Sequence, residues 1–342
     1  MNIALLLGGT SPERHVSMAS GRGVATALTE AGHTVTLYDP ARGDDARIAL
    51  DTLELPRETS PTHDELDSFS NASYLAAVQS IPADVDVAFL ALHGAPGEDG
   101  TVQSLLELRG IPYTGSGVLA SALAMDKAMS KRILDSQGVQ TPPWFLLRRG
   151  EGSHERLRDL VDQHTGYPVV VKPNDGGSTV GMTIVQEESE LVAAFALACE
   201  YGEAVLFEEF IDGRELTVAI LGDDSLPIVE IRPKSGFYDY KSKYTAGHTE
   251  YYCPADLPRS LEEEVRELAR RAHVALGCRG YSRVDFRLST ENVPFCLEVN
   301  TLPGMTATSL VPKAAAAAGM SFPDLCVRII ELAIGDVAEH AE

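Results

Sequence analysis

The sequence predicts an α/β protein that begins with a doubly wound, Rossmann-like domain and continues into a further α+β region. Three observations predict this class. Two apolar runs, at 3–7 and 85–92, each lead through a glycine-containing loop into a helical pattern. Continuous apolar runs of this kind are typical of buried parallel strands. A glycine-rich loop at 173–181 then joins two strand-like segments instead of opening a helix.

The N-terminal domain should contain two strand–loop–helix–strand units. Strands are expected at 3–7, 33–39, 85–92 and 111–115, and helices at about 17–31 and 101–109. Gly32 and Gly110 follow the two helices, at the position where a glycine commonly ends a helix. The segment 39–84 is polar and irregular, and its pattern predicts no element.

The rest of the chain alternates helical and strand-like patterns. Helices are expected at 118–137, 189–201, 258–276, 314–318 and 322–334, and strands at 167–172, 181–185, 281–288 and 293–300. An extended segment at 139–147 leads into the region of the glycine-rich loop. In a P-loop the lysine follows the glycines and opens a helix. Because Lys172 precedes the glycines on the incoming strand, we interpret the loop as a β-hairpin flap.

Composition and charge exclude several classes of protein. The 342 residues carry a formal net charge of −22, whereas binding to nucleic acid depends on cationic side chains that neutralise phosphates. We therefore expect no nucleic-acid partner, and an anionic ligand would need a local cluster of cations. The apolar run at 3–7 is too short to cross a membrane and lacks the basic flank of a signal peptide. A cytoplasmic protein with no membrane partner is expected.

The five cysteines predict neither a disulfide framework nor a thiolate zinc site. They are scattered through the second half of the chain, no two form a C-x-x-C pair, and their number is odd. We interpret them as small, buried hydrophobic residues.

Two strands near the C-terminus should bring polar side chains to one face of a hairpin. Alternation along a strand places Arg283 and Asp285 on the same side, and it places Glu298 and Asn300 on the same side of the next strand. Two carboxylates and an amide oxygen suit Mg²⁺ beside ATP phosphates. A solvated polar sheet face would give the same alternation and remains the alternative interpretation.

Eight sequence blocks, in order, resemble the D-alanine–D-alanine ligases of the ATP-grasp superfamily. The blocks are LLLGGTSPERHVS, HGAPGEDGTVQSLLELRGIPYTGSG, MDKAMSK, KPNDGGSTVGM, EEFIDGRELTVAIL, FYDYKSKY, SRVDF and LEVNTLPGMTATSLVPKAA. The resemblance implies a Rossmann-like domain at 1–120, a central ATP-grasp subdomain with the glycine-rich lid at 121–208, and a C-terminal subdomain at 209–342 that carries the metal site and the polar loop 233–254. ATP would lie between two antiparallel sheets, with the lid folded over its phosphates.

The same resemblance implies a nucleotide and metal site. Lys127 and Lys172 should contact the ATP phosphates, although either lysine alone would be interpreted as a surface charge. The other implied ATP-binding residues are Gly177, Ser178, Glu208, Glu209, Ile211, Glu215 and Lys243. Two Mg²⁺ or Mn²⁺ ions should be held by Asp285, Glu298 and Asn300, in agreement with the strand alternation.

For the first substrate, the resemblance implies that Glu13 holds the ammonium group of D-alanine and that His93 lies near it. Glu13, Ser178 and Tyr244 should form a hydrogen-bonded trio that closes the site. Without the family, Glu13 would be interpreted as an acid favoured by the dipole of the helix that follows it, and His93 as a structural histidine. His93 does, however, follow a predicted strand at the edge where α/β proteins bind ligands.

For the second substrate and the reaction, the resemblance implies four further residues. Arg283 and the Gly304 backbone should stabilise the tetrahedral oxyanion. Ser309 and Leu310, at a helix N-terminus, should hold the carboxylate of the second D-alanine. The reaction would pass through an acyl phosphate and give D-alanyl-D-alanine, ADP and phosphate for peptidoglycan precursor synthesis. The resemblance also implies a homodimer formed through the N-terminal domain.

Two alternatives stay open. A ligase that joins D-alanine to D-lactate or D-serine would share the fold, but Tyr244 favours the dipeptide enzyme because the resistance-type relatives often carry histidine in that loop. A non-catalytic ATP-binding protein would be expected to lack a metal ligand or Arg283, and all are present. Ala95, Pro96 and Gly176 depart from the family pattern close to the lid, which bears on closure and substrate affinity rather than on the chemistry.

Overall fold

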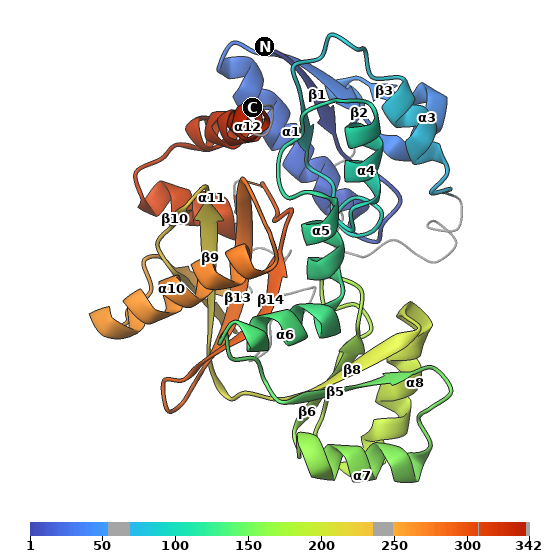
Figure 1. Cartoon of the computed structure of the whole chain (residues 1–342), viewed down its shortest axis with the longest axis vertical. Coiled ribbons are helices and arrows are strands. Elements are labelled where there is room, and N and C mark those ends of the chain that lie inside the picture. The colour runs from blue at the N-terminus through green and yellow to red at the C-terminus, as the bar shows by residue number, and fades with distance from the viewer. Residues whose placement is uncertain (54–68, 235–248, 307, 340–342) are drawn as a thin grey trace.

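The fold is described from a computed structural model over residues 1–53, 69–234, 249–306 and 308–339 (Figure 1). Lys243 and Tyr244, two of the predicted site residues, lie outside these ranges. Figure 1 shows the N-terminal region at the top, a second sheet at the lower left and a third at the lower right. Within the described ranges, no helix is long and apolar enough to cross a membrane.

The N-terminal region is built on a mostly parallel sheet. Its elements are β1 (Asn2–Leu6), α1 (Arg14–Glu30), β2 (Thr34–Tyr38), η1 (Pro40–Asp45), β3 (Arg47–Ile48), η2 (Leu50–Thr52), α3 (Ser73–Gln79), β4 (Val87–Leu90) and α4 (Thr101–Leu108). β1 lies between β2 and β4 and pairs in parallel with both, and β3 closes the β2 edge in antiparallel orientation. The doubly wound prediction is confirmed, and four of these elements come from the segment 39–84 that the pattern left unassigned.

Two details of this region differ from expectation. α1 begins at Arg14, earlier than expected, because the carbonyl oxygens of Ser11 and Glu13 accept the N–H groups of Arg14 and Ser17. The strand expected at 111–115 is reduced to a single parallel bridge between Ala88 and Tyr113.

The single helix predicted at 118–137 is wrong, because the chain breaks at Asp126. α5 (Val118–Met125) ends there, and α6 (Lys127–Ser136) begins with Asp126 in an extended conformation as its N-cap. The Asp126 carboxylate accepts the Met129 N–H and the Asn174 side-chain amide, each at 2.9 Å. Asn174 follows the strand that leads to the lid. The break therefore depends on a tertiary contact, and the apolar pattern on either side of it continues without interruption.

The central region is a four-stranded antiparallel sheet with two helices. Its elements are β5 (Trp144–Arg148), α7 (His154–His164), β6 (Val169–Pro173), β7 (Thr183–Val185), η3 (Glu188–Glu190), α8 (Leu191–Tyr201) and β8 (Ala204–Glu209). The strand order is β5-β8-β6-β7, and the lid joins β6 to β7 as a hairpin, as predicted. Phe145 and Phe207 stack at 4.5 Å in its core. The sequence analysis did not predict α7.

The C-terminal region is a six-stranded antiparallel sheet. Its elements are β9 (Gly213–Leu221), β10 (Asp224–Ser225), β11 (Val229–Pro233), β12 (Thr249–Tyr252), α10 (Arg259–Ala275), β13 (Tyr281–Ser289), β14 (Pro294–Asn300), α11 (Leu310–Ala317) and α12 (Phe322–Glu339). The strand order is β12-β11-β9-β13-β14, with β10 paired to β9. α12 packs against α1 and shares the core of the N-terminal region (Figure 1). The five cysteines are free, but only Cys296 and Cys326 are buried as expected, while Cys199, Cys253 and Cys278 are partly exposed.

Candidate active site

A cavity of about 150 Å³ is lined by strands of both antiparallel sheets, by α6 and by the lid. Every described residue that the resemblance assigned to ATP lines this cavity. These residues are Lys127, Lys172, Gly177, Ser178, Glu208, Glu209, Ile211 and Glu215, and the cavity is also lined by Arg283, Asp285, Glu298 and Leu310. The sheets therefore bring together residues that are far apart in the sequence.

The predicted polar face is present on the β13–β14 hairpin. Arg283 stands opposite Asn300, and Asp285 stands opposite Glu298. Asp285 accepts hydrogen bonds from Arg283 at 2.9 and 2.7 Å and from the Thr217 hydroxyl at 2.6 Å. The cross-strand partners hold the two carboxylates side by side, so they can share a cation.

The donor chemistry of this face fits a hard divalent cation. Within the described ranges no group of three or more His, Cys, Asp and Glu side chains could hold a metal, so the candidate set depends on two carboxylates and one amide. Glu298 is one-third exposed, and Asn300 Oδ1 accepts the Leu302 N–H at 3.1 Å, which orients the amide. Oxygen donors of this kind suit Mg²⁺ or Mn²⁺. A bound ion would share Asp285 with the Arg283 guanidinium.

Lys127 links the lid to this carboxylate face. As the first residue of α6, it donates from Nζ to the Gly176 carbonyl at 2.5 Å, and Nζ lies 3.9 Å from Glu298 Oε2. Burial lowers the pKa of Lys127, while Glu298 opposes that shift. Gly176, one of the departures from the family pattern, contributes its backbone here, and a Cβ at that position would meet no atom within 4 Å.

Lys131, Lys172 and Glu208 form a buried lysine–glutamate cluster at the wall of the cavity, to which Lys172 and Glu208 contribute. Lys131 Nζ lies 2.6 Å from Glu208 Oε1, and Lys172 contacts the other oxygen, Oε2. Lys131 is 1% exposed and Glu208 is 2% exposed. Burial alone would raise the pKa of Glu208, but the two lysines lower it to about 2. The carboxylate is therefore ionised and paired with two lysines, and burial lowers the pKa of one of them, Lys131.

Sequence reasoning missed Lys131. The available signal was its spacing of four residues from Lys127 in MDKAMSK, which puts both lysines on one helix face. Nothing in the sequence pattern showed that this helix face would contact Glu208, because that glutamate lies on β8 of the central sheet.

The glycine-rich lid lies against the N-terminal region. The Ser178 hydroxyl donates to Glu13 Oε1, so one link of the predicted trio is present among the described residues. A Cβ on Gly177 would lie 2.7 Å from Glu13 Oε2. Ser178 and Thr179 adopt φ values of 51° and 61°, a left-handed conformation that is uncommon for residues with a side chain. The lid thus approaches Glu13 so closely that a side chain at 177 would require the Glu13 carboxylate or the lid to move.

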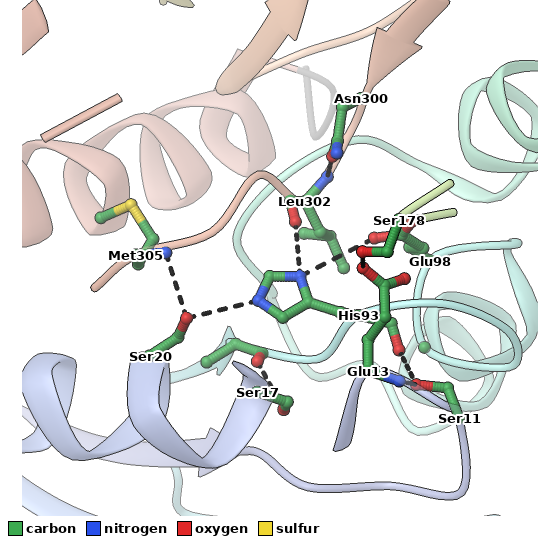
Figure 2. A network of polar contacts seen from close by, with 12 residues as sticks. Ser11, Glu13, Ser17, Ser20, His93, Glu98, Ser178, Asn300, Leu302 and Met305 are labelled. Atoms are coloured by element: carbon green, nitrogen blue, oxygen red, sulfur yellow. Dashed lines mark hydrogen bonds and ion pairs between the residues drawn. The ribbon is translucent and has the colours of Figure 1, made fainter. Parts of the chain in front are cut away.

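His93 is buried and is not among the side chains that line the cavity. Figure 2 shows its ring between α1 and the segment that follows β14. Burial lowers the pKa of His93, which favours the neutral ring. Glu98 Oε2 lies 4.0 Å from His93 Nδ1, and burial raises the pKa of Glu98 well above its ordinary value.

The residues predicted for the second substrate meet at the start of α11. Ser309 is the N-cap residue, and its hydroxyl accepts the Thr306 N–H at 3.0 Å. Leu310 lines the cavity. A Cβ on Gly304 would lie 3.0 Å from Ser309 Oγ, so these two predicted positions are close neighbours.

Comparisons with known proteins agree with this arrangement. The family model "D-ala D-ala ligase N-terminus" matches residues 2–116, and "D-ala D-ala ligase C-terminus" matches residues 133–331. The D-alanine–D-alanine ligase of Syntrophotalea carbinolica is 46% identical over 328 residues, which cover 96% of this chain and 94% of the relative. The ligase of Pelotomaculum thermopropionicum is 42% identical over 340 residues, with 98% and 97% covered. The crystal structure of the D-alanine–D-alanine ligase from Bacillus anthracis complexed with ATP has a TM-score of 0.77, with 33% identity and 99% of each chain covered.

Proposed function

The chain belongs to the D-alanine–D-alanine ligase family, and on that premise we propose that it joins two D-alanines, with ATP consumed and ADP and phosphate released. The product, D-alanyl-D-alanine, would serve peptidoglycan precursor synthesis. The observation that carries this proposal is the cavity between two antiparallel sheets, where lysines meet a carboxylate face under a glycine-rich lid.

ATP is proposed to occupy this cavity. Lys127 and Lys172 bring ammonium groups to the phosphate end, and Gly177 and Ser178 bring the lid backbone over it. The purine and ribose would lie against Glu208, Glu209, Ile211 and Glu215, and Lys243 would contribute from the polar loop. The ATP complex of the Bacillus anthracis ligase supports this use of the fold.

Asp285, Glu298 and Asn300 are proposed to hold two Mg²⁺ or Mn²⁺ ions. When bound, these ions would neutralise charge on the transferred phosphoryl group. The support is the donor set itself, in which the two carboxylates are cross-strand neighbours and Leu302 orients the amide oxygen.

The chemistry follows from the weakness of a carboxylate as an acylating agent. Transfer of the γ-phosphoryl group to the first D-alanine would give an acyl phosphate, which has a good leaving group, and the second amine would attack its carbonyl. Glu13 would bind the first ammonium group, with His93 nearby, and Ser309 and Leu310 would bind the second carboxylate. The closed lid would exclude water, which would otherwise hydrolyse the acyl phosphate.

Arg283 and the Gly304 N–H are proposed to stabilise the tetrahedral oxyanion. Arg283 lines the cavity beside Asp285. Among the described residues, the Gly304 N–H has no hydrogen-bond partner, so it is available to a substrate oxygen. Glu13 and Ser178 already form one side of the proposed trio, and Tyr244 would complete it.

Phosphate release measured with D-alanine, L-alanine and no amino acid tests the proposed function. We expect release only with D-alanine, and D-alanyl-D-alanine as the product. Release that is equal in all three reactions would contradict the proposal. The same assay with D-lactate or D-serine as the second substrate separates the alternatives, because a main product other than the dipeptide would overturn the choice of acceptor.

The wider organisation of the chain is proposed from the sheets and from exposed apolar residues. We propose the domain boundaries 1–120, 121–208 and 209–342, since each range contains one of the three sheets, apart from Glu209 at the end of β8. Leu108 and Leu119 are 85% and 71% exposed on neighbouring helices of the N-terminal side, which supports a homodimer through this region. A reaction that consumes ATP supports a cytoplasmic location.

A further inference from the structure

The His93 ring joins the N-terminal region to the segment that follows β14. Its Nδ1 lies 3.0 Å from the Leu302 carbonyl oxygen, and its Nε2 lies 3.3 Å from Ser20 Oγ (Figure 2). Both ring nitrogens are therefore engaged by protein groups, and neither remains for a direct hydrogen bond to a substrate. The contribution of His93 has to pass through its neighbours.

Hydrogen-bond chemistry gives each of these contacts a direction. A carbonyl oxygen only accepts, so His93 carries a proton on Nδ1 and donates it to Leu302. In the neutral ring Nε2 is then an acceptor, and the Ser20 hydroxyl donates to it. The Ser20 oxygen in turn accepts the Met305 N–H at 3.1 Å. We call Ser20, His93, Leu302 and Met305 the His93 network.

The His93 network holds both ends of one short segment. The Leu302 carbonyl is fixed at one end and the Met305 N–H at the other, with Pro303 and Gly304 between them. Proline has no N–H and glycine has no side chain, so these two residues offer few groups that could fix the segment by hydrogen bonding or side-chain packing. The direction of the Gly304 N–H therefore depends on the two anchored ends.

We propose that His93 is a positioning residue that, together with Ser20, fixes the 302–305 segment from the N-terminal region and so aims the Gly304 N–H at the reacting carbonyl. This inference rests on the oxyanion role given to Gly304 in the proposed function. It assigns catalytic importance to α1, which supplies Ser20 and does not line the cavity. A donor misplaced by about 1 Å can cost about a hundredfold in rate.

Ser20→Ala is the sharpest test, because Ser17 provides a matched control on the same helix. Both serines are fully buried, and Ser17 likewise accepts one backbone N–H, from Gly8, and donates to one carbonyl, of Ala91. Its hydrogen bonds stay within the N-terminal region. We expect Ser20→Ala to lower kcat about ten- to hundredfold with little change in the KM for ATP. Ser17→Ala should lose similar stability and keep kcat within about twofold. Equal kcat in the two variants would overturn the proposal.

A double-mutant cycle tests whether Ser20 and His93 act as one unit. His93→Asn keeps an amide donor near the Nδ1 position and removes the acceptor that Ser20 uses. Because both changes break the same link, the Ser20→Ala/His93→Asn double variant should be no slower than the slower single variant. Independent, multiplying losses in kcat would overturn the proposal.

The tautomer gives a readout that does not depend on catalysis. In ¹⁵N NMR of histidine-labelled protein, the resonances that disappear in His93→Gln should report a neutral ring protonated on Nδ1. A ring protonated on Nε2 alone would overturn the inference even in a fully active ligase. Failure of the proposed function is a separate result, because the unaltered enzyme would then release no phosphate with D-alanine.

Discussion

Two sets of buried polar side chains hold the parts of the site in place, and they differ in charge. The lysine–glutamate cluster consists of ions: Glu208 is paired with Lys131 and Lys172, and the three side chains are mostly or fully buried. The His93 network consists of neutral groups, in which a ring, a hydroxyl and two backbone groups share directed hydrogen bonds.

The difference reflects what each set has to do. The cluster adjoins the proposed phosphate site, where an anionic ligand requires a local surplus of cations in a chain whose net charge is −22. The 302–305 segment needs direction rather than charge. Neutral hydrogen bonds supply direction without the desolvation cost of buried ions. The buried polar side chains thus provide charge beside the proposed phosphate site, and in the other region they fix the orientation of the 302–305 segment.

The largest effect should come from disrupting the lysine–glutamate cluster. Lys131→Met leaves Glu208 buried with one partner fewer, and we expect it to cost about 3–5 kcal/mol of unfolding free energy. Arg132→Met, one position along on the exposed side, should cost no more than about 1 kcal/mol through its contact with Trp144. Urea denaturation measures both.

Ser20→Ala should cost less than Lys131→Met, about 1–3 kcal/mol. Equal losses of unfolding free energy in Lys131→Met and Ser20→Ala would contradict the expected difference between the lysine–glutamate cluster and the His93 network.

Removing a carboxylate from the proposed metal site on β13 and β14 should come next. Asp285→Ala and Glu298→Ala should each lower ADP release more than about a hundredfold, because a proposed direct metal ligand matters more than the residues that support it. Both variants should remain folded by circular dichroism. Glu291→Ala, at an exposed position in the turn of the same hairpin, serves as the control. Turnover near that of the unaltered enzyme in both ligand variants would argue against the metal assignment.

Gly177→Ala should disturb the contact between lid and N-terminal region. The added Cβ would lie 2.7 Å from Glu13 Oε2, so either the Glu13 carboxylate or the lid has to shift, and both changes disturb the Glu13–Ser178 contact. We expect kcat to fall about ten- to hundredfold with the fold intact. In a Glu13→Ala background the clash is absent, and Gly177→Ala should then have little further effect. Losses that multiply in the double variant would show that the clash is not the cause.

The smallest effects should appear in the pH dependence of stability, in two separate windows. The pKa of Glu208 is lowered from 4.5 to about 2, so its stabilisation is complete above pH 4.5 and is lost as the pH falls toward 2. Burial also lowers the pKa of His93 from its ordinary 6.5, so the neutral ring stabilises fully above pH 6.5 and loses that contribution as the pH falls below it.

Urea midpoints measured against pH can separate these windows. Glu208→Gln should flatten the slope below pH 4.5, and His93→Asn should flatten the slope just below pH 6.5. Glu13 and Arg283 also face the ring, with opposite effects on its pKa. Because the pKa of Glu98 is raised, the contribution of this carboxyl to stability is lost as the pH rises, opposite to the effect of His93. A Glu98→Gln background removes this effect. A His93→Asn slope identical to that of the unaltered protein would contradict a titrating ring.

Much of the site was predictable because its signal is local. Alternation along β13 and β14 was enough to put Asp285 and Glu298 on one face, and the sequence order of Lys172 and the glycines was enough to predict a hairpin lid. Both rest on the period of a strand or on the chemistry of a turn. Assigning nucleotide and substrate roles required the family resemblance, since single lysines or histidines carry little information by themselves.

What the sequence determined by itself is the β1, β2, β4, β6, β7, β13 and β14 strands, most of the long helices, and the face of β13 and β14 on which the polar groups lie, because backbone geometry repeats every two or 3.6 residues. Only the tertiary structure decided the break at Asp126, the partner of Lys131 and the bonds of His93. Each depends on a group more than 40 residues away in the sequence, supplied by a distant part of the chain. The physical reason is that a buried polar atom takes whichever partner the packing brings within about 3 Å, and local periodicity does not specify that partner.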